Sequence, residues 1–155
     1  MTDFSIHGVA LDKSTGMPLV ILFDPKHNVS VGLQVGPSEA SAIIVELEGV
    51  QPPRPLTHDL LSQMFLRHGF SLNTVEVYGQ LEDRYLARIR YSKGFRKYTM
   101  ETRPSDAIAL AVRLTAPILI DEACIPSLAF LHSDGAYSEA DFLYLENQQI
   151  NSQVV

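Results

Sequence analysis

Short apolar runs separated by turn-like segments fill residues 4–35 and predict β-strands. The runs VALD, PLVILFD and VSVGLQV are rich in β-branched residues, and KSTG and PKHN lie between them. Further strands are expected in SLNTVEVYGQ and APILID, and RYLARIRY and RKYTMET should form a hairpin around SKGF. One face of that hairpin, which carries Ala87 and Ile89, is expected to pack, and the other is polar and basic.

Three segments instead repeat apolar residues at helical spacing. They are GPSEASAIIVELEG, THDLLSQMFLRHG and RPSDAIALAVRLT, and Gly49 and Gly69 are expected to end the first two. The residues expected to face the core are Ala40, Ile43, Ile44, Leu47, Leu60, Leu61, Met64, Phe65, Ile108, Ala111 and Val112. Towards the C-terminus, EADFLYLEN is expected to form one or two amphipathic helical turns before a frayed tail.

The order of these elements predicts the fold class. Strands and helices do not alternate as they do in a doubly wound sheet, so we expect an α+β fold. The chain has 155 residues, enough for a single compact domain with a mixed or antiparallel sheet and about three helices.

Charge is unevenly distributed along the chain. Seven of the twelve Lys and Arg residues lie between Arg84 and Arg103, opposed there only by Glu101, so this segment carries +6 and the rest −12. The net charge of −6 argues against binding nucleic acid by bulk attraction alone. No apolar run is long enough to span a membrane, and the first residues are unlike a signal peptide, so a cytoplasmic location without membrane contact is expected.

All three predicted helices begin with the same sequence pattern. PSEA, PLTHD and PSDA each place a hydroxyl residue after proline and an acid in the first turn. We expect Ser38, Thr57 and Ser105 to cap the helices. Many residue types can occupy this position in the first turn of a helix, yet all three predicted helices have an acid there. Glu39, Asp59 and Asp106 could therefore meet at one site.

Two arginines, Arg54 and Arg103, each precede the proline of a predicted helix start. A guanidinium in that position suits recognition of phosphate or carboxylate. The alternative is a structural ion pair, for instance Arg103 with Asp59 or Arg54 with Asp106. His58 is a candidate general acid, although a single histidine at a helix start is more often a satisfied boundary residue.

Carboxylates brought together by the fold could hold a hard cation. Glu39, Asp59 and Asp106 are the candidate ligands for Mg²⁺ or Mn²⁺, with Glu46 or Asp83 as further donors. No sequence pattern indicates an organic cofactor. On the basic hairpin face, Arg88, Arg90 and Lys97 are candidates for contacts with a nucleic-acid backbone, or are simply solvated.

Taken together, GPSEASAI, LEGV, PPRPLTHDLL and TRPSDAIALAVR resemble the bifunctional nuclease domain family over roughly residues 8–125. The resemblance implies an α+β domain over residues 1–125 that dimerises and cleaves both DNA and RNA. Residues 126–155 would be an extension, partly helical or frayed. The positions that match the family motifs are Glu39, Arg54, Thr57, His58, Asp59, Arg103, Ser105 and Asp106.

Two functional hypotheses therefore stand side by side. In the first, Glu39, His58, Asp59 and Asp106 form a metal-assisted phosphodiesterase centre, and Arg54 and Arg103 hold the scissile phosphate. In the second, the chain is a non-catalytic dimeric module whose helix N-termini bind an anionic small molecule, or that binds a protein partner. A third reading is that the motifs only specify a rigid fold.

Overall fold

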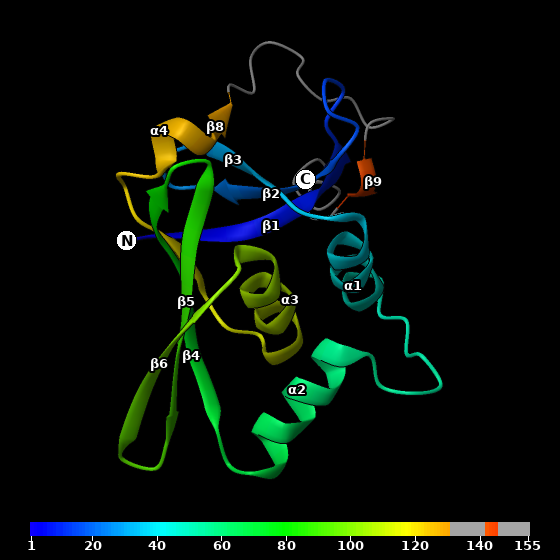
Figure 1. Cartoon of the computed structure of the whole chain (residues 1–155), viewed down its shortest axis with the longest axis vertical. Helices are drawn as coiled ribbons and strands as arrows, with labels where there is room; N and C mark the ends of the chain where they lie inside the picture. The colour runs from blue at the N-terminus through cyan, green and yellow to red at the C-terminus, as the bar shows by residue number, and fades with distance from the viewer. Residues whose placement is uncertain (131–141, 146–155) are drawn as a thin grey trace, which may run out of the picture.

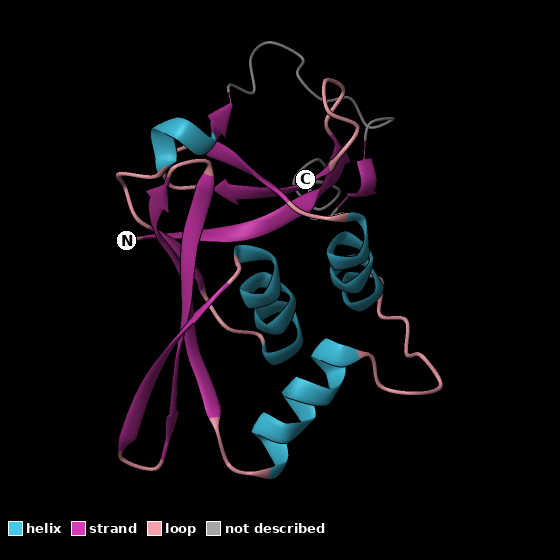
Figure 2. Ribbon diagram, in the orientation of Figure 1, coloured by secondary structure: helices cyan, strands magenta, loops and turns pink. Residues whose placement is uncertain are grey.

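A strongly twisted mixed β-sheet carries the three long helices on one side (Figures 1 and 2). The computed structural model describes residues 1–130 and 142–145. The strands are β1 (Thr2–Leu11), β2 (Pro18–Asp24), β3 (Val29–Gln34), β4 (Ser71–Leu81), β5 (Arg84–Lys93), β6 (Arg96–Thr102), β7 (Ile118–Ile120), β8 (Ala129–Phe130) and β9 (Phe142–Leu145). The helices are α1 (Pro37–Leu47), α2 (Thr57–Arg67), α3 (Pro104–Leu114) and α4 (Ile125–Leu128).

The strand order is β6-β5-β4-β7-β1-β2-β3-β8, with β9 on β1. Among the described strands only the pair β4–β7 is parallel, and all other pairs are antiparallel. Strand β1 joins the two halves, because its first residues pair with β7 and its later residues pair with β2. The predicted α+β class with a mixed sheet is confirmed.

The pairing of β4 with β5 contains two register shifts, which explain why the apolar residues of β4 do not alternate strictly. The register shifts between Leu72 and Thr74, so Leu72, Val75 and Val77 can all contribute to the apolar face. Opposite them, Ala87 and Ile89 of β5 are buried, as the hairpin pattern predicts. A bulge of this kind increases local twist, and β4, β5 and β6 form a long twisted ribbon whose lower end lies level with α2 (Figures 1 and 2).

Helix α3 is the most buried helix and lies closest to strands β4 and β5, with α1 and α2 beside it (Figure 1). Its buried residues are Ser105, Ala107, Ile108, Ala109, Leu110 and Ala111. The small alanine side chains allow close approach of its neighbours. The predicted inward residues Ile108 and Ala111 are confirmed, whereas Val112 is only half-buried.

The predicted burial of helix α2 was largely wrong. Only Ser62 and Phe65 are buried, whereas Leu60, Leu61 and Met64 are 56%, 40% and 51% exposed. The apolar residues do form a stripe along α2, but the helix packs at the margin of the molecule. No described element covers the part of the stripe formed by Leu60, Leu61 and Met64. An exposed set of large apolar side chains of this kind indicates an interaction surface.

Backbone geometry, not hydroxyl side chains, defines the starts of the three long helices. The N-caps are Gly36, Leu56 and Arg103, and none of them forms a side-chain capping hydrogen bond. Ser38, Thr57 and Ser105 therefore lie inside the first turn, and their predicted role as caps was wrong. At the other ends, Gly49 and Gly69 adopt positive φ just after α1 and α2, as expected.

The C-terminal segment differs from the predicted helical turns. Residues 142–145, within EADFLYLEN, form strand β9, which pairs with β1. The expected frayed tail lies outside the described residues. None of the described helices is both long and apolar enough to cross a membrane.

Candidate functional site

The three first-turn acids occupy equivalent positions in their helices. Glu39, Asp59 and Asp106 are each the third helical residue after the N-cap. An acid at this position lies near the positive end of the helix dipole. Asp59 Oδ2 accepts a hydrogen bond from the N–H of Leu56 at 2.9 Å, so local helix chemistry explains part of the recurrence.

Arg103 connects two of these acids. Its Nε and Nη2 donate to Asp106 Oδ2 and Oδ1 at 2.6 and 3.1 Å, which is a bidentate pair within the first turn of α3. Its Nη1 donates to Glu39 Oε1 at 3.2 Å across to α1. The N-termini of α1 and α3 therefore meet at one guanidinium, which is itself 66% exposed.

His58 adds the start of α2 to this cluster. Its Nε2 lies 3.0 Å from Asp106 Oδ1, so Asp106 is bonded from two sides. The imidazole is mostly buried, with 15% of the side chain exposed. The structure thus brings together Glu39, His58, Arg103 and Asp106 from three segments that are distant in the sequence.

Both acids of the cluster are held ionised. Burial opposes the charged form of Asp106, but hydrogen bonds from Arg103 and His58 outweigh it and lower the pKa of the carboxyl group. The pKa of Glu39 is lowered by a hydrogen bond from its own backbone N–H and then by Ser38, with a further contribution from the charge of Arg103. The pKa of Arg103 is raised, mainly by its hydrogen bond to Asp106.

Asp59 belongs to a different contact. Its Oδ1 accepts a hydrogen bond at 2.7 Å from Nε of Arg113, a guanidinium that is only 2% exposed. Arg113 also donates to the carbonyl oxygens of Ala42 in α1 and Ala109 in α3. Asp59 therefore helps to tie the three helices together.

The suggested ion pairs of Arg103 with Asp59 and of Arg54 with Asp106 are wrong. Arg103 pairs with Asp106 and Glu39, and Asp59 pairs with Arg113. Arg54 is exposed on the connector before α2 and forms no ion pair with the residues that the structure describes.

The basic residues of the hairpin lie on the other face of the sheet. Ala87 and Ile89 face α3, so Arg88 and Arg90, which alternate with them, point away from the helices. Their Nε atoms each donate at 2.6 Å to the buried carboxylate of Glu76 on β4. Lys97 is on the same outer face of β6. The fold does not bring these three residues to the cluster around Arg103.

A groove of about 970 Å³ runs beside the cluster. Its lining includes Glu39, Arg103 and Ser105 from the helix starts, Asp83 from the β4–β5 turn and Arg84 from the start of β5. His58 and Asp106 do not line it, and they are connected with it through the bonds of Asp106 to Arg103 and of His58 to Asp106. The charged lining residues are Glu39, Asp83 and Glu101 against Arg84 and Arg103, a sum of −1.

The predicted metal ligands do not form a ready metal site. Among the described residues, no group of three or more His, Cys, Asp or Glu side chains is placed to hold an ion. Asp59 is turned towards Arg113, while Glu39 and Asp106 share Arg103. Of the further donors considered, Asp83 lines the groove, and Glu46 lies near the end of α1.

Sequence reasoning missed three residues that shape the site. Arg113 follows Asp106 by seven residues on α3, so helical spacing placed both on one face and was a usable signal. Arg84 lines the groove, but it was counted only as part of the basic segment. Glu76 could not be found as the partner of Arg88 and Arg90 without the strand register.

Comparison with known proteins gives the family. The bifunctional nuclease domain matches residues 20–130. An uncharacterized protein of Mycobacterium tuberculosis, in strains CDC 1551 and H37Rv, is 30% identical over 148 residues, which is 96% of this chain and 88% of the relative.

Plant relatives match a shorter stretch. Bifunctional nuclease 1 of Oryza sativa subsp. indica and the bifunctional nuclease of Oryza minuta are each 28% identical over 82 residues, covering 51% of this chain and 25% of the plant protein. From the domain match and the near full-length mycobacterial relative, the chain belongs to the bifunctional nuclease domain family.

Proposed function

We propose that the chain hydrolyses phosphodiester bonds of DNA and RNA in the groove beside Arg103. The observation that carries the proposal is the exposed guanidinium of Arg103, fixed by two carboxylates at the wall of that groove. A guanidinium has five N–H donors, and three are used by Asp106 and Glu39. Two donors are left for phosphate oxygens.

The neighbouring residues support distinct roles in this reaction. Arg84 lines the same groove and supplies a second cation for the phosphate. Glu39 is kept ionised at the groove wall, and its carboxylate is the candidate to orient an attacking water molecule, although its lowered pKa makes it a weak base. Asp106 bonds Arg103 directly and His58 bonds Asp106, so these two residues act by fixing the orientation of Arg103. Direct proton transfer by His58 stays a prediction, because His58 does not line the groove.

Charge limits how the substrate binds. The lining sum of −1 means that a nucleic acid is not drawn in by bulk attraction, so binding depends on the two guanidiniums. Dependence on Mg²⁺ or Mn²⁺ stays a prediction, because the described residues present no formed ligand set. We further propose that the protein works in the cytoplasm as a homodimer.

A nuclease assay tests the proposal. Single-stranded RNA and duplex DNA are incubated with wild type, Arg103→Gln and Glu39→Gln, each with Mg²⁺, Mn²⁺ or EDTA. Loss of a preorganised charge contact should lower kcat by about 10²-fold. Arg67→Gln is the matched control, since Arg67 is exposed on α2 and does not line the groove. Equal residual cleavage in all four proteins would point to a contaminating nuclease and reject the site.

A second candidate is a non-catalytic module that binds an anionic small molecule or a protein partner. It is favoured by one observation: Glu39, Asp59 and Asp106 are each already paired with an arginine. A rise in Tm with inorganic phosphate or nucleotides in EDTA, without turnover and lost in Arg103→Gln, would support this candidate over the nuclease.

A further inference from the structure

Strand β6 forms an open edge of the sheet. It stands at one end of the strand order, where it pairs with β5 and with no other described strand. Six of its seven residues are exposed, and only Thr102 is half-buried. An exposed edge strand presents unpaired backbone donors and acceptors, which is a template for pairing with another strand.

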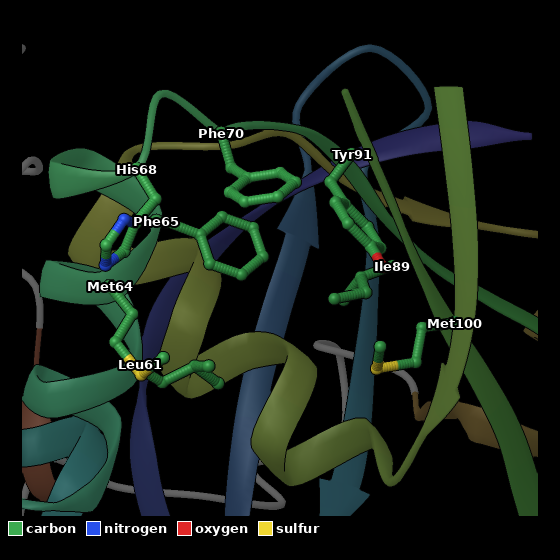
Figure 3. Close-up of a pocket in the computed structure, with 8 residues that line it drawn as sticks. All are labelled: Leu61, Met64, Phe65, His68, Phe70, Ile89, Tyr91 and Met100. Atoms are coloured by element: carbon green, nitrogen blue, oxygen red, sulfur yellow. The ribbon is translucent and has the colours of Figure 1, made fainter. Parts of the chain in front are cut away.

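Apolar side chains adjoin this edge on the face that carries the helices. Tyr98 and Met100 of β6 are 37% and 52% exposed, and Leu61 and Met64 of α2 lie across a pocket from Met100 (Figure 3). Between them lies an apolar pocket of about 220 Å³, walled by α2 on one side and by Ile89, Tyr91 and Met100 on the other (Figure 3). We call Leu61, Met64, Tyr98 and Met100 the edge patch.

We propose that a second copy of this chain docks here, with its β6 antiparallel to β6 of the first copy about a two-fold axis at Thr99. The two sheets then form one continuous sheet, and the two edge patches lie on the same face beside the axis. An isologous contact of this kind uses the same surface on both subunits. The pairing concerns assembly alone and does not depend on the proposed hydrolysis.

The side chains of β6 are complementary to themselves in this register. Tyr98 lies opposite Met100 of the second copy on the helix-bearing face, which joins apolar to apolar. On the outer face Lys97 lies opposite Glu101 of the second copy, and symmetry repeats this pair of opposite charges. Thr99 lies opposite itself at the axis.

Neighbouring registers that keep each side chain on its own face are poorer. Centring the axis on Met100 would place Lys97 against Arg103, a contact of like charges. Centring it on Tyr98 would place Arg96 against Met100 and leave Lys97 opposite Thr99. A slip of one residue would set the apolar face of one strand against the polar face of the other.

Charge reversal across the axis tests the register. The dimer dissociation constant of the full chain is measured by analytical ultracentrifugation for wild type, Lys97→Glu, Glu101→Lys and the double variant. Each single variant creates two symmetry-related contacts of like charge, so we expect at least about tenfold weaker association. The double variant restores opposite charges and should return to within about threefold of wild type.

Two controls separate this effect from folding and from general charge. Lys26→Glu makes the same charge change in the exposed turn between β2 and β3 and should leave association unchanged. Glu101→Lys also loses the hydrogen bond from Tyr78, so thermal unfolding is followed for every variant. Independently of both charges, Thr99→Cys should cross-link two chains at the axis under mild oxidation, whereas Ser14→Cys in a distant turn should not.

A wild-type chain that is monomeric at about 100 μM, far above the Kd of most specific interfaces, would overturn the proposal. So would a dimer that none of the variants weakens, or one that the double variant fails to restore. A wild-type chain that is monomeric but cleaves nucleic acid would reject the dimer and leave the hydrolysis proposal standing. A wild-type dimer without cleavage would reject the hydrolysis and leave the dimer standing.

Discussion

Arg113 Nε and Asp59 Oδ1 are 2.7 Å apart, and this contact removes Asp59 from the carboxylate group in which the motif pattern placed it. Arg113 is almost fully buried, and its other donors bond to the carbonyl oxygens of Ala42 and Ala109. One guanidinium therefore joins α1, α2 and α3. His58, one residue before Asp59, lies in the same first turn of α2.

Replacing Arg113 by methionine should destabilise the fold markedly. The change leaves Asp59 without its cation, and removing one partner of a buried ion pair typically costs about 3–5 kcal/mol. Because Asp59 is 17% exposed, we expect the lower end, about 3 kcal/mol in the free energy of unfolding. Urea unfolding measures it. Arg67→Met on exposed α2 should stay within about 0.5 kcal/mol of wild type, and a similar loss in both variants would contradict the role of Arg113.

The stability of the chain should decrease in acid through Asp59. Burial opposes its charged form, but hydrogen bonds from Arg113 and from the N–H of Leu56 outweigh burial and lower its pKa in the folded chain. A lowered pKa gives stability that is present above the unfolded value of about 3.9 and is lost as pH falls through the folded value. Asp59→Asn should therefore be clearly less stable than wild type at pH 7. Below a pH of about 4 the difference should shrink, and a difference that is constant with pH would refute this assignment.

Gly36→Ala should displace the Glu39 carboxylate and reduce cleavage while changing the free energy of unfolding only slightly. A Cβ at Gly36 would lie 2.1 Å from Oε2 of Glu39, so the carboxylate must swing away from its position beside Arg103. The moving atoms end a flexible side chain, so we expect a cost below about 1 kcal/mol in unfolding free energy. Cleavage should fall as in Glu39→Gln. Gly79→Ala is the control, because its Cβ meets only Leu86 at 3.6 Å, and wild-type cleavage by Gly36→Ala would remove Glu39 from the site.

Glu76→Gln tests the network on the outer face. Glu76 is buried and accepts hydrogen bonds from Arg88 and Arg90, so a neutral amide leaves two guanidiniums without their carboxylate. The expected loss in unfolding free energy is about 1–3 kcal/mol. Glu82→Gln in the exposed β4–β5 turn should change stability by less than about 0.5 kcal/mol. Chemical denaturation at pH 7 measures the free energy of unfolding of both variants. Equal values for Glu76→Gln and Glu82→Gln would show that the hydrogen bonds of Glu76 do not stabilise the fold.

Local pattern was enough to predict much of the fold. Strand and helix periods placed the three long helices, the β5–β6 hairpin and the buried residues Ala87, Ile89 and Ile108, because these depend on which face of an element is apolar. The family resemblance rested on motifs that span the helix starts, and the domain match confirms it. Glu39, His58, Arg103 and Asp106 were also named from the sequence.

Only the tertiary structure decided which charges meet. Asp59 and Asp106 occur in the same local sequence pattern, yet Asp59 binds Arg113 and Asp106 binds Arg103. The partners differ because the packing of the helices decides which side chains meet. The same reason separates Arg88 and Arg90 from the groove and leaves Leu60, Leu61 and Met64 of α2 exposed. Periodicity shows which face of a helix is apolar, but what covers that face depends on contacts between residues far apart in the chain.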